Sequence, residues 1–281
     1  MKTNRKVMWM ILLVAGTLCA GKAAFAQMGQ YPQPQAPAQL PSASSKDSLS
    51  MENTVTLPPS SKKETSAIKS FRGTADTDAD KKEKMAEDFL QKYPESRYRE
   101  EIVSWQATQL MTKGDVDKLQ AMGEKEMTMV PISGEALAVI GSNLARVVTG
   151  STPNLQDHVR HAEKYCTKAL EVLTAEKRPT DIKEEDFTKS KNQSMSVAYS
   201  GLGVVAFRDS DYPKAIQNMD QASKLEQTPD SVNYYILGKA NEAASHPDAA
   251  LAAYTKCAAI PGGVQAACKG AADDLKAHGA K

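Results

Sequence analysis

Two histidines and a cysteine stand close enough in the sequence to suggest metal chemistry. His158 and His161 are three positions apart, about one helical turn, and Cys166 follows further along. Imidazole and thiolate groups are common ligands of zinc, so a metal site is one interpretation of this spacing. In the alternative interpretation both histidines begin a helix among charged residues, and Cys166 occupies a small packing position. We favour the alternative and predict no metal site and no cofactor.

The sequence carries no recognisable catalytic constellation. It contains many serines, but no Gly-x-Ser-x-Gly elbow, no paired-histidine zinc protease motif and no glycine-rich phosphate loop. Glu184, Glu185 and Asp186 form a run of like charges, which is typical of a solvated surface. Because no group has even two chemical partners at suitable spacing, we predict a protein without catalytic residues.

The first 26 residues predict export. They comprise a positive start with Lys2, Arg5 and Lys6, an apolar run from Val7 to Leu18, and the small residues of Ala24-Phe25-Ala26. These are the parts of a cleavable signal peptide, and the apolar run is too short for a stable membrane span. We predict cleavage after Ala26, a mature chain that begins at Gln27, and a location in the periplasm or cell envelope. Lipidation of Cys19 is the alternative, but Leu18 stands where that processing requires Gly, Ala or Ser.

The charge balance of the exported chain argues against nucleic-acid binding. Cleavage after Ala26 lowers the number of Lys and Arg residues from 35 to 31, against 34 Asp and Glu. The mature chain is therefore slightly acidic, and it has no basic surplus to attract nucleic acid or an anionic membrane surface. We predict that it binds no nucleic acid and is not an integral membrane protein.

A long segment after the signal peptide is too polar to fold. From Gln27 onward the sequence is rich in Pro, Gln, Ser and Ala, as in the run Tyr31-Pro32-Gln33-Pro34-Gln35-Ala36-Pro37. Such a composition cannot bury enough apolar surface to offset the entropy lost on ordering. We predict a disordered linker over residues 27–75, with the folded sequence beginning near Asp76.

Residues 196–264 contain one helical pattern twice in succession. Each copy has a tyrosine, then a Leu-Gly pair, then small and large residues at helical spacing. The matched positions are Tyr199, Leu202, Gly203, Ala215, Met219 and Ala222 in the first copy, and Tyr234, Leu237, Gly238, Ala250, Tyr254 and Cys257 in the second. Each matched pair is 35 residues apart. Because glycine lacks a Cβ, two antiparallel helices can approach closely there, while the larger residues fill the remaining space.

This pattern resembles the tetratricopeptide repeat (TPR), in which an aromatic residue and a Leu-Gly pair precede an alanine and an aromatic residue of the second helix. The resemblance is clearest over residues 196–229 and 231–264. It implies a right-handed solenoid of helical hairpins, closed by a C-terminal capping helix over residues 265–278. It also implies a binding platform without a reaction of its own.

Weaker hairpins precede the two clear copies. One helix is expected around Phe89, and a helix pair after it carries Trp105 among its apolar packing positions. The stretch Phe89–Ser96 is also similar to the repeats of periplasmic envelope-assembly proteins. A middle hairpin over residues 133–174 has a connector about nine residues longer than that of the clear copies, which a surface loop tolerates. We predict an all-α fold over residues 76–281, with about four hairpins and a cap.

The resemblance also implies where partners bind. First helices of successive hairpins line the concave groove of such arrays, and peptides or helices dock there. The groove-facing candidates are Arg146, Val204, Phe207, Arg208, Tyr235, Lys239 and Glu242. We expect an exported, non-enzymatic scaffold or adaptor that binds protein or peptide partners. The alternative is an accessory subunit of an outer-membrane assembly or secretion machine.

Three cysteines remain after the predicted cleavage: Cys166, Cys257 and Cys268. Export implies an oxidising compartment, where cysteines pair. Cys257 lies late in the last repeat and Cys268 in the capping helix, with the turn Pro261-Gly262-Gly263 between them, so we predict that these two form a disulfide. In the alternative, Cys257 fills the packing slot that Ala222 fills in the previous copy, and Cys268 faces away.

Overall fold

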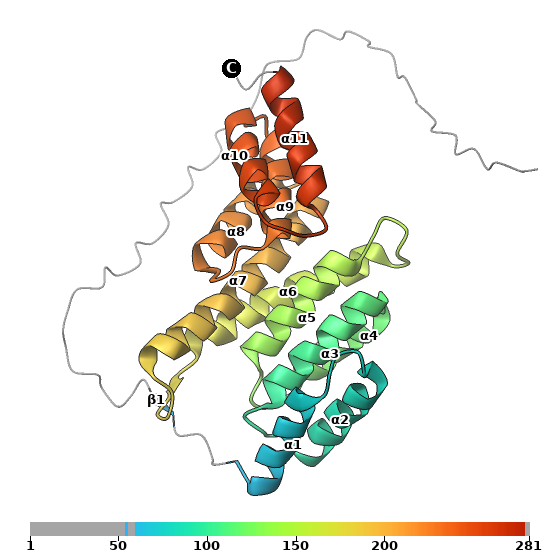
Figure 1. The fold of residues 1–281 in the computed structure, drawn as a ribbon, viewed down its shortest axis with the longest axis vertical. Helices are drawn as coiled ribbons and strands as arrows, with labels where there is room; N and C mark the ends of the chain where they lie inside the picture. Colours follow the sequence, from blue (N-terminus) through green and yellow to red (C-terminus); the bar gives the residue numbers. More distant parts are fainter. Residues whose placement is uncertain (1–53, 56–59, 279–281) are drawn as a thin grey trace, which may run out of the picture. The chain divides into compact units, whose positions relative to one another are not determined.

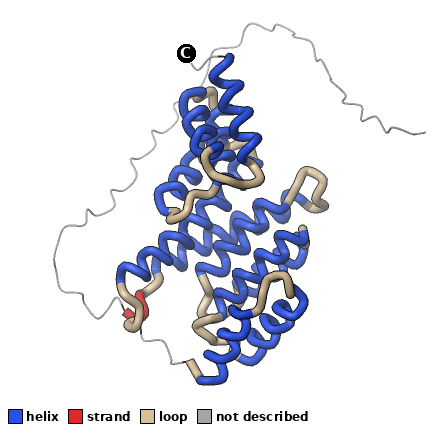
Figure 2. Tube along the Cα trace, viewed as in Figure 1, coloured by secondary structure: helices blue, strands red, loops and turns tan. Residues whose placement is uncertain are grey.

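The computed structural model describes residues 54–55 and 60–278, which belong to one compact unit. The predicted signal peptide and most of the predicted linker lie outside the described residues. The helices are α1 (Lys62–Gly73), α2 (Ala79–Lys92), α3 (Arg99–Lys113), α4 (Val116–Glu126), α5 (Gly134–Val147), α6 (Leu155–Ala175), α7 (Glu184–Arg208), α8 (Tyr212–Leu225), α9 (Ser231–Ala243), α10 (Pro247–Ala258) and α11 (Gln265–His278). The strands are β1 (Thr54–Val55) and β2 (Arg178–Pro179). Helix and short connecting loops account for nearly all of this part (Figures 1 and 2).

Consecutive helices pack as pairs, and the pairs stack on one another. The pairs are α1 with α2, α3 with α4, α5 with α6, α7 with α8 and α9 with α10, and α11 packs on α10 (Figure 1). The second helix of each pair also contacts the first helix of the next pair, and α5 packs against both α3 and α7. The predicted all-α fold is confirmed, and the arrangement is compatible with a helical repeat. The handedness of the array and its kinship with TPR proteins stay predictions.

Three of the hairpin turns share one backbone geometry. Gly114, Ser210 and Ser245 each have a positive φ, of 70°, 61° and 61°. The next residue in each turn donates its N–H to a carbonyl five positions earlier, from Asp115 to Leu110 (3.0 Å), from Asp211 to Ala206 (2.9 Å) and from His246 to Asn241 (2.8 Å). A left-handed residue that closes a helix in this way satisfies carbonyls that would otherwise lack a partner. Ser210 and Ser245 are 35 residues apart, so the turn repeats with the period of the sequence.

The repeated glycines lie where paired helices approach most closely. A Cβ added to Gly203 of α7 would lie 2.7 Å from Cε of Met219 in α8, and one added to Gly238 of α9 would lie 2.5 Å from Cε1 of Tyr254 in α10. Real Cβ contacts are not this short, so a side chain at either glycine would force Met219, Tyr254 or the facing helix to shift. The structure confirms the close approach that the Leu-Gly pairs predict.

The middle hairpin, α5–α6, has a similar close contact at a glycine, although the loop between its two helices is longer. A Cβ on Gly141 of α5 would lie 2.6 Å from Sγ of Cys166 in α6. These two residues are 25 positions apart, whereas Gly203 and Met219 are 16 apart, and the difference is the nine residues that the connector adds. Asn154 begins α6 with a φ of 53°, outside the turn geometry of the other three hairpins.

Helix α1 corrects the predicted end of the linker. Residues 62–73 were expected to be disordered, but they form a helix that buries Ile68 and Phe71. Ser61 accepts a hydrogen bond from the Glu64 N–H (3.1 Å), and the Glu64 carboxylate accepts one from the Ser61 N–H (3.3 Å), which together form a capping box. This cap starts the helix, and two apolar residues three positions apart suffice to hold it against its neighbours. The array therefore has a fifth helix pair, at its N-terminal end.

A short strand pair joins the start of the described chain to the α6–α7 loop. β1 runs parallel to β2, with Thr54 opposite Arg178 and Val55 opposite Pro179. The Thr180 N–H donates to the Val55 carbonyl (2.9 Å). The same loop is tied to the α2–α3 loop, because Arg97 donates to the Asp181 carboxylate (2.7 Å). Neither strand was predicted from the sequence.

The C-terminal helix covers the range predicted for the cap. α11 buries Cys268 and Ala272 against Tyr254 and Cys257 of α10. Cys257 and Cys268 lie at disulfide distance, with Cα atoms 5.8 Å apart. Cys166 lies in the central core, where burial raises the pKa of its thiol to about 12.

Candidate functional site

Arg146, a predicted groove residue, joins three helix pairs. From α5 its guanidinium donates to the hydroxyl of Ser200 in α7 (2.7 Å), to the carboxylate of Asp230 (2.7 Å) and to the side-chain carbonyl of Asn233 in α9 (3.1 Å). Asp230 also caps α9 by accepting from the Val232 N–H (2.9 Å). Arg146 thus links neighbouring helix pairs of the array, whereas the sequence suggested that it contacts a partner.

Arg208 and Val204 of α7 also face the interior of the array: Arg208 is hydrogen-bonded to α5, and Val204 is buried. Arg208 donates to the carbonyl of Ala145 (3.1 Å) and to that of Val148 (2.6 Å), where it satisfies the C-terminal end of α5. Burial lowers the pKa of Arg208. Val204 is only 4% exposed, so it presents almost no surface to a partner.

The remaining groove candidates keep part of their surface. In α9, Lys239 lies 3.4 Å from the Glu242 carboxylate, which also accepts a hydrogen bond from the Tyr254 hydroxyl (2.8 Å). The Tyr235 ring packs 6.3 Å from that of Tyr254. Phe207 packs against Tyr212 at the turn between α7 and α8. The structure therefore links Tyr235, Lys239 and Glu242 through Tyr254, and ties the two arginines to other partners.

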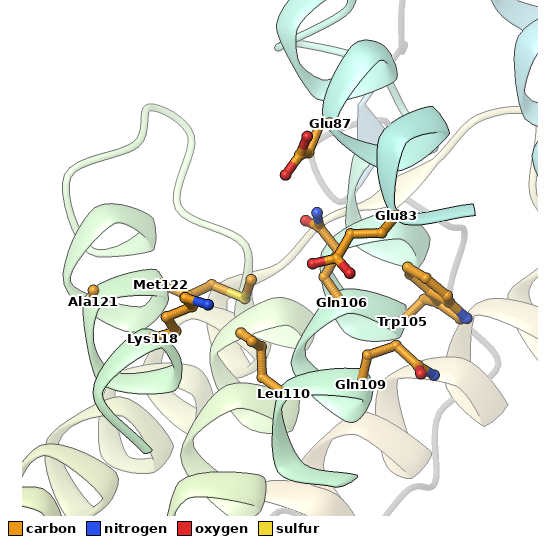
Figure 3. Close-up of a pocket in the computed structure, with 9 residues that line it drawn as sticks. All are labelled: Glu83, Glu87, Trp105, Gln106, Gln109, Leu110, Lys118, Ala121 and Met122. Carbon is orange, nitrogen blue, oxygen red and sulfur yellow. The ribbon is translucent and has the colours of Figure 1, made fainter. Parts of the chain in front are cut away.

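A different surface, between α2, α3 and α4, offers a cavity of about 240 Å³. We call it the Trp105 hollow. Its lining residues are Glu83, Glu87, Trp105, Gln106, Gln109, Leu110, Lys118, Ala121 and Met122. Figure 3 shows Met122 of α4 pointing toward Leu110 and Gln106 of α3, with Trp105 and Gln109 on the far side. Trp105 was expected among the packing positions, and this hollow was not predicted from the sequence.

Trp105 is held rigidly at the edge of the hollow. Its indole N–H donates to the Asp76 carboxylate (3.1 Å), and its ring stands edge-on to Phe71, with ring centres 5.4 Å apart. The Lys82 ammonium lies 5.4 Å from the Trp105 ring centre and 2.7 Å from the Asp76 carboxylate. The hydrogen bonds from Lys82 and Trp105 hold the pKa of Asp76 below its usual value. These contacts orient a partly buried tryptophan at the edge of the hollow.

The lining of the Trp105 hollow combines apolar and amide groups. Leu110 and Met122 supply an apolar floor, while Gln106 and Gln109 supply amide groups that can donate and accept. Two of the charged rim residues already have partners, since Glu83 pairs with Lys113 (2.7 Å) and Lys118 with Asp115 (2.9 Å). An apolar floor with a few polar groups is the usual composition of a ligand site.

The two histidines at the start of α6 face α4. His158 hydrogen-bonds through Nδ1 to the Gln120 side-chain oxygen (2.7 Å), and His161 Nδ1 lies 2.9 Å from the carbonyl oxygen of Asp157. No group of three His, Cys, Asp or Glu side chains in residues 54–55 and 60–278 is arranged to hold a metal ion.

Searches against models of known protein families and against curated proteins find no match for this chain. Within the part of the chain that the structure describes, no helix has both the length and the apolar character required to cross a bilayer.

Proposed function

We propose that this protein is an exported, non-enzymatic adaptor of the TPR type that binds a protein or peptide partner. The observation that carries the proposal is the Trp105 hollow, where a partly buried tryptophan held by Asp76 and Phe71 adjoins an apolar floor and two glutamine amides. Tryptophan is enriched among the residues that dominate binding energy at protein interfaces, and a side chain already fixed in place loses little entropy on binding.

Two further features support this function. The repeated turns and the close glycine contacts are those expected of stacked helical hairpins, an architecture that presents extended binding surfaces. The signal-like N-terminus and the Cys257–Cys268 pair both favour an oxidising compartment outside the cytoplasm.

Crosslinking in cells, followed by identification of the bound protein, tests the proposal. Three chains should be compared: the parent, Trp105→Ala and Tyr235→Ala. The first variant removes the aromatic ring of the hollow, and the second alters the concave groove predicted from the repeat. We expect Trp105→Ala to lose the crosslinked partner by about tenfold or more, since hot-spot truncations typically cost 2 kcal/mol or more, and Tyr235→Ala to retain it.

Circular dichroism melts should accompany the crosslinking, because Trp105 also contacts Phe71 and Lys82. Gln109→Ala changes the hollow without touching these contacts, so it separates partner loss from a folding defect. Loss of the partner in Tyr235→Ala alone would place the binding surface in the predicted concave groove. Absence of any specific crosslinked protein would contradict the adaptor function.

A further inference from the structure

The Trp105 hollow has the size of a site for side chains of a larger partner. Its volume is about 240 Å³. Pockets that enclose small-molecule ligands usually measure about 300 to 1,000 Å³, so this hollow lies below their range. A space of this size takes a few side chains from a segment that lies across it. The occupant that fits is therefore a stretch of another polypeptide chain.

The charges that line the hollow leave one carboxylate without a partner. Glu83 is paired with Lys113 (2.7 Å), and Lys118 is paired with Asp115 (2.9 Å). Glu87 is exposed, and its carboxylate forms no ion pair or hydrogen bond in the part of the chain that the structure describes. The uncompensated charge of the lining is therefore negative, and it is complementary to a positively charged side chain.

The uncharged groups of the lining are also open to a partner. Figure 3 shows Glu87 on the α2 side of the hollow and Met122 on the α4 side. The side-chain amides of Gln106 and Gln109 make no hydrogen bond among the described residues, so they can bond to the main chain of a bound segment. Leu110 and Met122 form the apolar floor, and a methionine adapts to apolar side chains of different shape.

We infer that the Trp105 hollow recognises a segment of a partner protein in which a lysine or arginine adjoins a large apolar residue. The inference rests on the proposed function of the hollow as a partner-binding surface. The apolar side chain packs on Leu110, Met122 and the Trp105 ring. The basic side chain pairs with Glu87, and the glutamine amides bond to the main chain. An acidic segment is disfavoured, because it would bring a like charge next to Glu87.

Selection from a random peptide display library tests the inference before any partner is known. The bait is the chain that begins at Gln27. Peptides count as bound in the hollow when Trp105→Ala weakens their binding about tenfold or more and Gln109→Ala about threefold. The second variant leaves the contacts of Trp105 with Phe71 and Asp76 intact, so a folding defect does not decide the result. We expect these peptides to be enriched in lysine or arginine beside a large apolar residue.

Charge variants of α2 then isolate the contact with Glu87. Glu87→Lys should reverse the preference, so that aspartate or glutamate takes the place of the basic residue in the selected peptides. Asp88→Lys is the matched control, because it makes the same change of charge at a neighbouring exposed position outside the lining, and it should keep the basic preference. Glu87→Gln should weaken the basic peptides about three- to fivefold, and high salt should reduce this difference.

The outcomes separate this inference from the proposed function. Peptides that bind in the hollow without a basic residue, or that keep a basic residue in Glu87→Lys, would overturn the charge preference and leave the hollow as a binding surface. Failure to select any peptide that depends on both Trp105 and Gln109 would overturn both. Crosslinking in cells tests the adaptor function by itself, and its result does not alter the peptide preferences.

Discussion

At the residue scale, Gly203 and Gly238 occupy matching positions but face different side chains. A Cβ on Gly203 meets the flexible end of Met219, whereas one on Gly238 meets the ring of Tyr254. A methionine can move to another rotamer, but a buried tyrosine ring cannot yield without shifting the helix. Equivalent substitutions at the two glycines should therefore differ in cost.

We predict that Gly238→Ala lowers the free energy of unfolding by about 1 to 3 kcal/mol, and that Gly203→Ala lowers it by less. Gly270→Ala in α11 is the control, because nothing lies within 4 Å of the added Cβ. There alanine should stabilise the helix by about 0.5 to 1 kcal/mol. Urea denaturation of the three variants measures these differences, and equal losses at Gly203 and Gly238 would show that the nature of the facing side chain is irrelevant.

Glu135 makes the stability of the array depend on pH. It lies in the first turn of α5, where burial and the nearby charges of Glu100, Glu176 and Glu101 raise the pKa of its carboxyl to about 7. The folded protein therefore binds this proton more tightly than the unfolded chain, in which the pKa is about 4.3. By linkage, the contribution of Glu135 to stability is greatest below the unfolded pKa and is lost as the pH rises to about 7.

We predict that Glu135→Gln removes this dependence. The variant should be more stable than the parent at pH 8 by about 1 to 2 kcal/mol, with the gap closing toward pH 5. Urea midpoints at the two pH values measure it. Glu95→Gln, an exposed change in the α2–α3 loop, is the control and should follow the parent. A gap of the same size at both pH values would contradict the role given to the carboxyl.

The site residues show which contacts a repeat pattern can predict. The pairing of Gly203 with Met219 and of Gly238 with Tyr254 follows from spacing within one hairpin, and the structure contains both contacts. The partners of Arg146 lie in two other helix pairs, up to 87 positions away. A period locates the helix face that carries Arg146, but it does not say which groups a neighbouring pair places opposite that face.

At the element scale, α11 packs on α10 around the Cys257–Cys268 pair. The helix packs on α10 through a small cluster, and the Cys257–Cys268 pair lies within it. The two cysteines enclose only 11 positions of sequence. A disulfide around so short a loop stabilises chiefly by restricting the unfolded chain, by about 3 kcal/mol.

We predict that reduction detaches α11 before the rest of the array unfolds. Hydrogen exchange over residues 265–278 should rise strongly in reductant, while exchange in α5 and α7 stays slow. The double variant Cys257→Ala/Cys268→Ala should match the reduced parent and show no response to reductant. Free alkylation of both thiols in protein taken directly from the cell envelope would contradict the bond.

The helices illustrate where local signals succeed and where they fail. α9 and α10 lie within the repeat expected over residues 231–264, where the periodicity is strong, and α11 covers the range expected for the cap. α1 escaped prediction because only Ile68 and Phe71 mark its buried face, within a stretch of otherwise polar sequence. The Trp105 hollow is formed by residues of α2, α3 and α4. The distances between these helices are set by their packing, which the sequence of any single helix does not reveal.

At the scale of the whole molecule, the predicted export signal fixes where the chain begins. The prediction is a mature protein that starts at Gln27, because Ala24 and Ala26 are the small residues that signal peptidase requires. N-terminal sequencing of protein recovered from the envelope fraction measures this directly. A start at Cys19 with an attached lipid would contradict it and would place the chain on a membrane anchor.

The strand pair β1–β2 determines how the molecule responds to mechanical force. Any pull on the chain before Thr54 reaches the two-residue strand pair first, and through β2 it is carried by the long helices α6 and α7 in the middle of the array. The outermost helix, α1, carries none of this force while β1 stays paired with β2. Once the backbone hydrogen bonds of β1 break, tension passes to α1, which Ile68, Phe71 and the Arg72–Glu101 ion pair hold against its neighbours. We therefore expect the strand pair β1–β2 to separate before α1 unfolds when the chain is pulled, and to pair again when the tension is released.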